Sequence, residues 1–175
     1  LQHLSMTQTP SFPLLEHPAF RGVSEASVST LENTCRVLRF DLGGQLCDSN
    51  DIPARILVIL QGQARLVGRH NGRLTTVGKF GPGSVIGAAS LLCGSPCENV
   101  IASEEVIACA ISDELWRGIY ASETSFRRWC DQQLWPQELL KLLEALEQNT
   151  PEASSSALEK LEGALQSAER CSPER

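Results

Sequence analysis

Residues 86–100 hold the residue types whose spacing could do chemistry, and their sequence is IGAASLLCGSPCENV. Small residues from Gly87 to Ser90 come first, and an apolar step then leads into a Gly-Ser-Pro bend. This layout is typical of a loop that holds a phosphate, because free backbone N–H groups at the start of a helix attract an anion. The only charge in the stretch is that of Glu98, which is negative. The sequence thus indicates an anion-binding loop that lacks a cation.

Cys93 and Cys97 place two thiols in the same bend. A thiolate at a helix N-terminus is stabilised, so a redox switch is one hypothesis for this pair. The C-x3-C spacing differs from the usual metal-binding and thioredoxin-type spacings, and His3, His17 and His70 are scattered along the chain. We therefore expect no metal site, and we interpret the cysteines in apolar, strand-like runs as packing residues.

Catalysis requires a nucleophile, a base and an orienting group that converge. The sequence has no activated-serine motif, no Gly-x4-Gly-Lys-Ser/Thr phosphate loop and no histidine-centred set. We interpret the pair Glu104-Glu105 as an exposed turn rather than as two catalytic carboxylates. We expect neither catalysis nor a cofactor in this segment.

The composition is that of one soluble domain with terminal additions: 175 residues, 42% hydrophobic and 21% charged. A net charge of −6 disfavours a nucleic-acid partner, because an acidic surface repels phosphate backbones. Apolar runs such as residues 56–60 have the length of strands, far below the roughly 20 residues of a membrane span, so we expect no direct membrane contact by this segment. The odd number of cysteines, 7, indicates a reducing, cytoplasmic compartment.

The residues before and around the anion loop divide into an arm, a segment at helical spacing and a β-rich region. Residues 1–17 contain prolines without sustained periodicity and are expected to form an arm. Apolar residues at near-helical spacing follow as far as Cys35, with Ser24 as the expected N-cap. From Arg36 to Ser112, short runs rich in Val, Ile and Leu alternate with Gly, Asn and Pro, which is the pattern of a β-sandwich or barrel.

The clearest local signal is Asn71-Gly72, which supplies the two positive-φ residues of a type I′ turn between two strands. After Ser112 the periodicity becomes helical. Ser112 can cap a helix over residues 113–120, and Pro136 suits the first turn of a later one. Two apolar stripes follow, and each must be buried on the domain or on a partner. They are Leu139, Leu142, Leu143 and Leu146, and, after a breaker, Leu158, Leu161, Leu165 and Ala168.

Four stretches in this order resemble the cyclic-nucleotide-binding domain, the β-roll of catabolite-activator-type regulators, kinase regulatory subunits and gated channels. They are HPAFR at 17–21, FDLGGQ at 40–45, ILVILQGQARLVG at 56–68, and residues 80–103, which include the anion loop. The resemblance covers about two-thirds of the chain, from His17 to Gln133. It implies a mainly β fold with flanking helices: an eight-stranded jelly roll, or double-stranded β-helix, with a phosphate-binding cassette at residues 83–101.

The expected domain organisation follows from the resemblance. Residues 1–17 form an N-terminal arm, residues 18–133 form the β-roll domain with its flanking helices, and residues 134–175 form a C-terminal helical extension.

In this family the cassette contains a short helix whose N-terminal amides meet the cyclic phosphate. A Glu accepts a hydrogen bond from the ribose 2′-hydroxyl, and an Arg pairs with the phosphate. In this chain Gly87 takes the position of the cassette glycine, Ala88 replaces the Glu, and Cys97 replaces the Arg and is followed by Glu98. The cassette is therefore expected to be degenerate. Its candidate ligand-binding positions are Gly87, Ala88, Ala89, Ser90, Cys97, Glu98 and Asn99.

The expected function is that of a non-catalytic regulatory or interaction domain that acts through protein contacts. One alternative is a working sensor of a cyclic nucleotide, cAMP or cGMP, or of another small anion. It would need Arg65, Arg69 or Arg73 to reach the pocket as a substitute cation. A thiol redox switch at Cys93 and Cys97 is the second alternative.

Residues 129–143, WCDQQLWPQELLKLL, also resemble the segment that follows the N-terminal cyclic-nucleotide-like domain of some bacterial, notably cyanobacterial, peptide-exporting ABC transporters. This resemblance implies a domain of a longer protein, tethered at the cytoplasmic face of the inner membrane. The expected partners are an effector module of that longer chain or a second copy that dimerises through the C-terminal helices.

Overall fold

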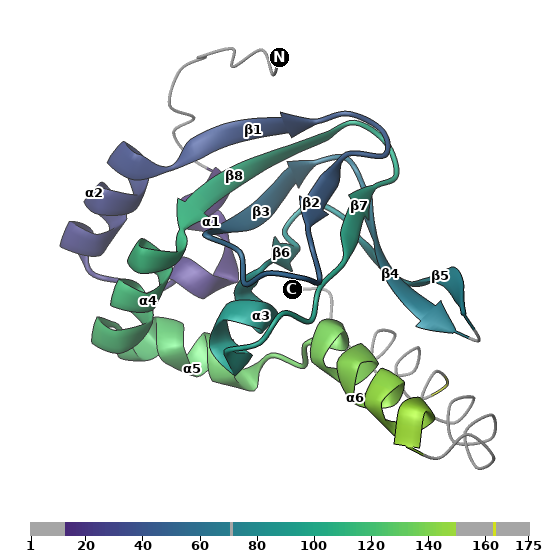
Figure 1. Ribbon diagram of the computed structural model, residues 1–175. Coiled ribbons are helices and arrows are strands. Elements are labelled where there is room, and N and C mark those ends of the chain that lie inside the picture. The colour runs from purple at the N-terminus through teal and green to yellow at the C-terminus, as the bar shows by residue number, and fades with distance from the viewer. Residues whose placement is uncertain (1–12, 71, 150–162, 164–175) are drawn as a thin grey trace.

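The computed structural model describes residues 13–70, 72–149 and 163. Two antiparallel four-stranded sheets form the body of the protein, and helices lie to the left of and below the strands in the view of Figure 1. The first sheet has the order β1 (Arg36–Phe40), β8 (Val106–Ser112), β3 (Arg55–Gln61), β6 (Val85–Ile86). The second has the order β2 (Gln45–Cys47), β7 (Val100–Ala102), β4 (Ala64–His70), β5 (Arg73–Phe80). This arrangement confirms the jelly roll.

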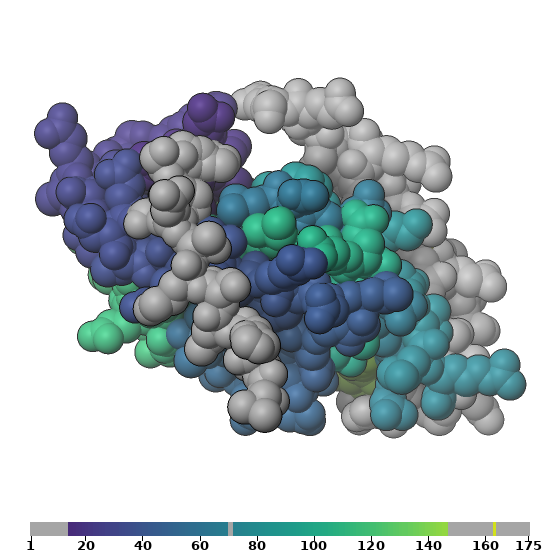
Figure 2. Space-filling view, turned by 90° about the horizontal axis from the view of Figure 1, so that it is seen from above, coloured from purple at the N-terminus to yellow at the C-terminus, as the bar shows by residue number. Residues whose placement is uncertain are grey.

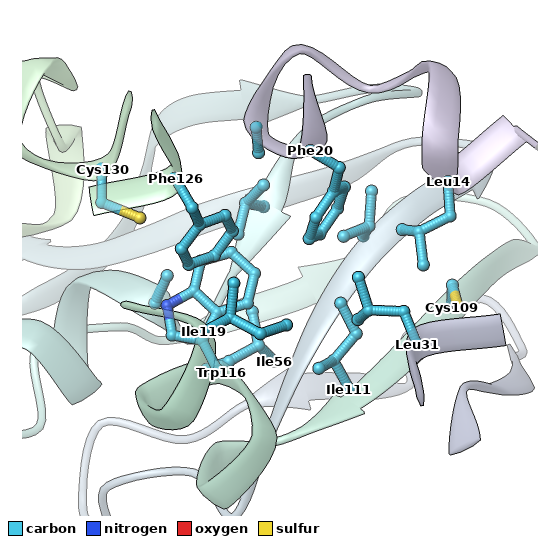
Figure 3. Close-up of a cluster of buried hydrophobic side chains, with 14 of the residues drawn as sticks. Leu14, Phe20, Leu31, Ile56, Cys109, Ile111, Trp116, Ile119, Phe126 and Cys130 are labelled. Carbon is cyan, nitrogen blue, oxygen red and sulfur yellow. The ribbon is translucent and has the colours of Figure 1, made fainter. Parts of the chain in front are cut away.

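Strand β3 explains how the core is divided. Successive side chains of a strand point to opposite faces, and both faces of β3 are buried. Leu57 and Ile59 join the core between the two sheets. Ile56 and Val58 instead join a second core that the helices cover, where Phe20 stacks on Phe126 and Trp116 meets both rings edge-on (Figure 3). The continuous apolar run at 56–60 is thus a strand buried on two sides.

The helices begin where the sequence predicts helix caps. They are α1 (Pro13–Glu16), the 3-10 turn η1 (Pro18–Phe20), α2 (Glu25–Thr34), α3 (Ala88–Cys93), α4 (Asp113–Ser122), α5 (Thr124–Gln132) and α6 (Pro136–Asn149). The hydroxyls of Ser24 and Ser112 accept backbone N–H groups of the first turns of α2 and α4, which confirms both as N-caps. The prediction that Pro136 lies in the first turn of a helix is also confirmed.

The entry to the domain differs from the expected arm and single helix. Leu14, within the expected arm, is buried in the aromatic core, and the residues between the arm and Ser24 form the 3-10 turn η1 and a loop rather than part of a helix. Pro18 and Gly22 account for the break: proline starts the short η1 turn, and Gly22 takes a positive φ of 78° that ends it. These N-terminal elements, purple in Figure 2, lie at one side of the strands.

The β4–β5 hairpin is confirmed. His70 pairs with Arg73 across a two-residue loop, and Gly72 has the positive φ of 75° that a type I′ turn needs. Asn71 lies outside the described residues. Among the helices of the described part, none has the length and apolarity to cross a membrane.

Helix α6 packs on the β-roll through a face that shares Leu143 with the predicted stripe but includes Gln137 and Leu140 in place of Leu142 and Leu146. Gln137, Leu140 and Leu143 are buried, whereas Leu142 and Leu146 are 56% and 47% exposed. The helix lies against α3 and β4 (Figure 1), and a glycine at residue 68 makes the close approach possible. A Cβ atom on that glycine would lie 2.8 Å from Leu140 Cδ1. The second predicted stripe, residues 158–168, lies outside the described residues.

Candidate functional site

The cassette lies between β6 and β7, where the chain turns sharply into α3. Gly87 is the N-cap of α3 and has φ +97°, a left-handed conformation that favours glycine. A Cβ atom there would lie 3.0 Å from Pro53 Cγ and 3.2 Å from the carbonyl oxygen of Arg55. Glycine is therefore required, and it allows the first backbone N–H groups of the turn to face inwards.

The Glu98 carboxylate lies on these N–H groups. Its side chain is fully buried, with 0% exposed. Oε1 accepts the backbone N–H of Gly87 at 2.9 Å. Oε2 accepts the backbone N–H of Ser90 at 3.1 Å and the Ser90 hydroxyl at 2.7 Å. Glu98, the single charged residue of the loop, thus caps the N-terminus of α3 although it lies outside the helix.

Gln137 completes the set of donors from the other side. Its Nε2 donates to Glu98 Oε1 at 2.9 Å, so each carboxylate oxygen accepts two hydrogen bonds. Within the described residues, no lysine or arginine forms an ion pair with this carboxylate. A buried charge without such partners would cost many kcal/mol. Four donors and the partial positive charge at the start of α3 take the place of a cation.

The thiols near the carboxylate are held un-ionised. Burial raises the pKa of Cys97 to about 12, and the nearby charge of Glu98 adds to the effect. Burial likewise raises the pKa of Cys47 to about 12, again with a contribution from Glu98. Cys97 Sγ lies 3.5 Å from the Ser90 hydroxyl. Cys93 is exposed, and its Sγ lies 3.2 Å from the carbonyl oxygen of Ser95.

The structure brings together four of the seven predicted positions: Gly87, Ser90, Cys97 and Glu98. Ala88 and Ala89 are fully buried by packing. Asn99 lies away from the carboxylate, where its Oδ1 accepts Gln45 Nε2 at 3.1 Å.

The hairpin arginines do not supply the missing cation in this structure. Arg65, Arg69 and Arg73 have exposed side chains on β4 and β5. Their positions are those of charged side chains that are solvated on the surface of a strand.

Sequence reasoning missed Gln137. The available signal was the phase of α6: Gln137, Leu140 and Leu143 recur at a spacing of three residues, which places one polar side chain in line with two apolar ones. The leucine-rich sequence offers several such lines, and the predicted stripe of Leu139, Leu142, Leu143 and Leu146 shares only Leu143 with this one. Nothing local links Gln137 to Glu98, because 39 residues separate them.

The two sheets and the short helix after β6 define a β-roll domain. Residues 37–123, about half of the chain, match the family model of the cyclic nucleotide-binding domain. A search of curated proteins finds no match to the chain.

Solved structures share the fold. A regulatory subunit of a cAMP-independent protein kinase A from Trypanosoma brucei superposes with a TM-score of 0.59 and 20% identity, over 71% of this chain and 46% of that one. A mutant of such a subunit, bound to cAMP in its A site, gives 0.53 and 17% over 68% and 48%. A cyclic nucleotide-binding domain from Methylobacillus flagellatus gives 0.51 and 22% over 78% and 74%. The chain spans about half the length of the two kinase subunits.

Proposed function

We propose that this chain is a non-catalytic regulatory or interaction domain whose degenerate cassette does not respond to cyclic nucleotides. One observation carries the proposal: the Glu98 carboxylate occupies the N–H groups of Gly87 and Ser90. In the family these amides meet the cyclic phosphate. A phosphate placed there would have to displace a buried carboxylate, and no arginine stands at residue 97 to attract it.

The expected loss of binding free energy for a cyclic nucleotide supports this proposal. Removing one partner of a buried charge pair costs about 2–5 kcal/mol. At about 1.4 kcal/mol per tenfold change, a site of roughly micromolar affinity would weaken to between tens of micromolar and millimolar. The Ala88 side chain offers no hydrogen-bond acceptor to a ribose hydroxyl, and Glu98 adds like-charge repulsion, so the affinity falls further.

The kinase subunits from Trypanosoma brucei offer a parallel. One is described as belonging to a cAMP-independent kinase. The cAMP-bound form carries three substitutions, one of which introduces arginine. The parallel suggests a design for this chain: Cys97→Arg restores a cation, and Glu98→Ala frees the amides.

The domain is proposed to act through protein contacts, as a module of a longer bacterial protein. The resemblance of residues 129–143 to peptide-exporting ABC transporters favours a position on the cytoplasmic side of the membrane, where the domain would modulate export. Its partner would be an effector module of the parent chain or a second copy, which light scattering distinguishes by mass.

Isothermal titration of the chain with cAMP and cGMP up to millimolar concentration tests the proposal. We expect no saturable heat from the wild type. The Cys97→Arg/Glu98→Ala variant should bind at least about 10-fold more tightly than a Cys97→Met/Glu98→Ala control, which frees the amides without adding a cation. Wild-type binding with a Kd below roughly 10 µM, or about −7 kcal/mol, would contradict the proposal.

The two alternatives have less support in the site. A working sensor needs a cation at the cassette, and the three hairpin arginines have exposed side chains. A thiol switch needs two reactive thiols, and burial holds the pKa of Cys97 at about 12.

A further inference from the structure

Several hydrogen bonds hold helix α6 against the cassette and the neighbouring strand. Gln137 donates to Glu98 in the interior. One turn later, Lys141 Nζ donates to the Ser95 hydroxyl and to the carbonyl oxygen of Pro96 at 3.2 Å. Near the other end, Glu144 Oε1 accepts the backbone N–H of Arg69 at 3.1 Å. The helix therefore connects the cassette bend to strand β4.

The contact between Gln137 and Glu98 differs from the other two in burial. Gln137 is 1% exposed and Glu98 is 0% exposed, whereas the hydrogen bonds of Lys141 and Glu144 lie at the surface. Hydrogen bonds to a charged group are stronger than neutral ones, and water does not compete in the interior. Surface pairs contribute little by comparison. The buried bond is therefore the polar contact that decides whether α6 stays in place.

Gln137 is a poor choice for packing alone. Its Oε1 is buried without a hydrogen-bond partner among the described residues, and an unpaired buried acceptor is destabilising. A leucine at this position would avoid that penalty while filling a similar volume. The amide is explained by its other end, since Nε2 is a donor that the Glu98 carboxylate requires.

We propose that Glu98 is a built-in ligand: from the anion position of the cassette it binds Gln137 and thereby latches α6 over the β-roll. The inference rests on the proposed function in one respect, that the anion position belongs to Glu98 rather than to a nucleotide. Because this anion is part of the chain, it cannot dissociate. The latch holds α6 on the β-roll without any nucleotide, and a protein partner that binds the helix would compete with it.

Hydrogen exchange of the full chain, without nucleotide, tests the latch. In Gln137→Leu the packing is retained and the donor is lost. In Glu98→Gln, an NH2 group replaces one of the two acceptor oxygens and must face at least one of the donors, to which it cannot hydrogen-bond as an acceptor. Both variants should accelerate exchange of the α6 amides, residues 136–149, by about 10- to 100-fold, the factor that corresponds to a hydrogen bond to a charged group.

Two controls make the test specific. Glu144→Gln, on the same helix, keeps an acceptor for the Arg69 N–H and should leave exchange in α6 within about twofold of the wild type. The Glu98→Gln/Gln137→Leu double variant should exchange no faster in α6 than the faster single variant, because both substitutions remove one shared bond.

Unchanged or slower exchange in α6 of Gln137→Leu overturns the latch, since that outcome means that packing alone holds the helix. If Glu98→Gln destabilises the whole β-roll, Gln137→Leu still decides, because its side chain comes from outside the two sheets. Nucleotide binding by the wild type contradicts the proposed function instead. Failure of the latch and failure of the proposed function are therefore detected by separate measurements.

Discussion

The thiols around the cassette differ in exposure, and this difference can be measured. Cys93 is exposed, whereas Cys97 is buried and has its pKa raised to about 12, so almost none of its thiolate is present at neutral pH. We expect an aromatic disulfide reagent at pH 7.5 to modify Cys93 in the fast phase and Cys97 only after unfolding. Substituting Cys93→Ser should then remove one equivalent from the fast phase, and Cys97→Ser should remove none. Loss of a fast equivalent in both variants would revive the redox alternative.

His17 gives the native state a dependence on pH. Burial is the main cause that lowers its pKa below the ordinary value of 6.5, and the charge of Arg21 adds to it, while a hydrogen bond to the Gly83 carbonyl opposes it. Nδ1 accepts the backbone N–H of Ala19 at 3.1 Å, which requires the neutral ring. The folded state therefore binds a proton less readily than the unfolded chain. Its stability is fully present above pH 6.5 and falls as the pH drops below that value.

The measurement is the Tm of the wild type and of His17→Gln at pH 7.5 and pH 5.5. The wild type should lose more on acidification than the variant does, by about 2 °C or more. Carboxyl groups titrate in both proteins and cancel in the comparison. An equal loss in both would mean that His17 does not couple protonation to folding.

Local residue types predicted much of the fold, because their effects act over a few residues. Asn71-Gly72 predicted the hairpin, and Ser24 and Ser112 predicted two helix starts, since turn and cap geometry depends on the residue itself. The role of Glu98 could not be predicted in this way. A lone glutamate after a bend is ordinarily solvated, and one of the donors that satisfies it in the interior is Gln137, which only the tertiary fold brings near.

At the scale of the element, α6 shows that a leucine-rich sequence does not specify which face of a helix is buried. Leu140 is 8% exposed and packs beside Gly68, whereas Leu142 on the same helix is 56% exposed. We expect Leu140→Ala to lower the free energy of unfolding by about 2–3 kcal/mol, because it removes buried methyl groups and leaves a cavity. Leu142→Ala should change it by less than about 0.5 kcal/mol.

Urea unfolding of the two variants makes a matched comparison, since both substitutions are Leu→Ala in one helix. Equal effects would mean that α6 has no fixed face on the β-roll. A larger effect for Leu142→Ala would mean that the side of α6 that carries Leu142 packs on the domain.

At the scale of the whole molecule, the open question is where the folding unit ends. The sequence placed the end of the domain at residue 133, and the aromatic core around Trp116 and Phe126 is complete by that point. Leu140, however, belongs to the core between the sheets, and Gln137 donates to the cassette carboxylate. These contacts argue that α6 is part of the folding unit rather than an extension of it.

Comparing two shortened chains, residues 1–135 and 1–149, isolates α6 and tests this argument. The chain ending at 135 should still fold, because its aromatic core is intact, but it should lose about 3.5–5 kcal/mol relative to the chain ending at 149. Loss of the burial of Leu140 contributes about 2–3 kcal/mol of this, and loss of a hydrogen bond to the buried carboxylate contributes about 1.5–2 kcal/mol. Guanidinium unfolding measures both stabilities under the same conditions. Equal stabilities would return the boundary to residue 133 and leave the anion position of Glu98 self-sufficient without its latch.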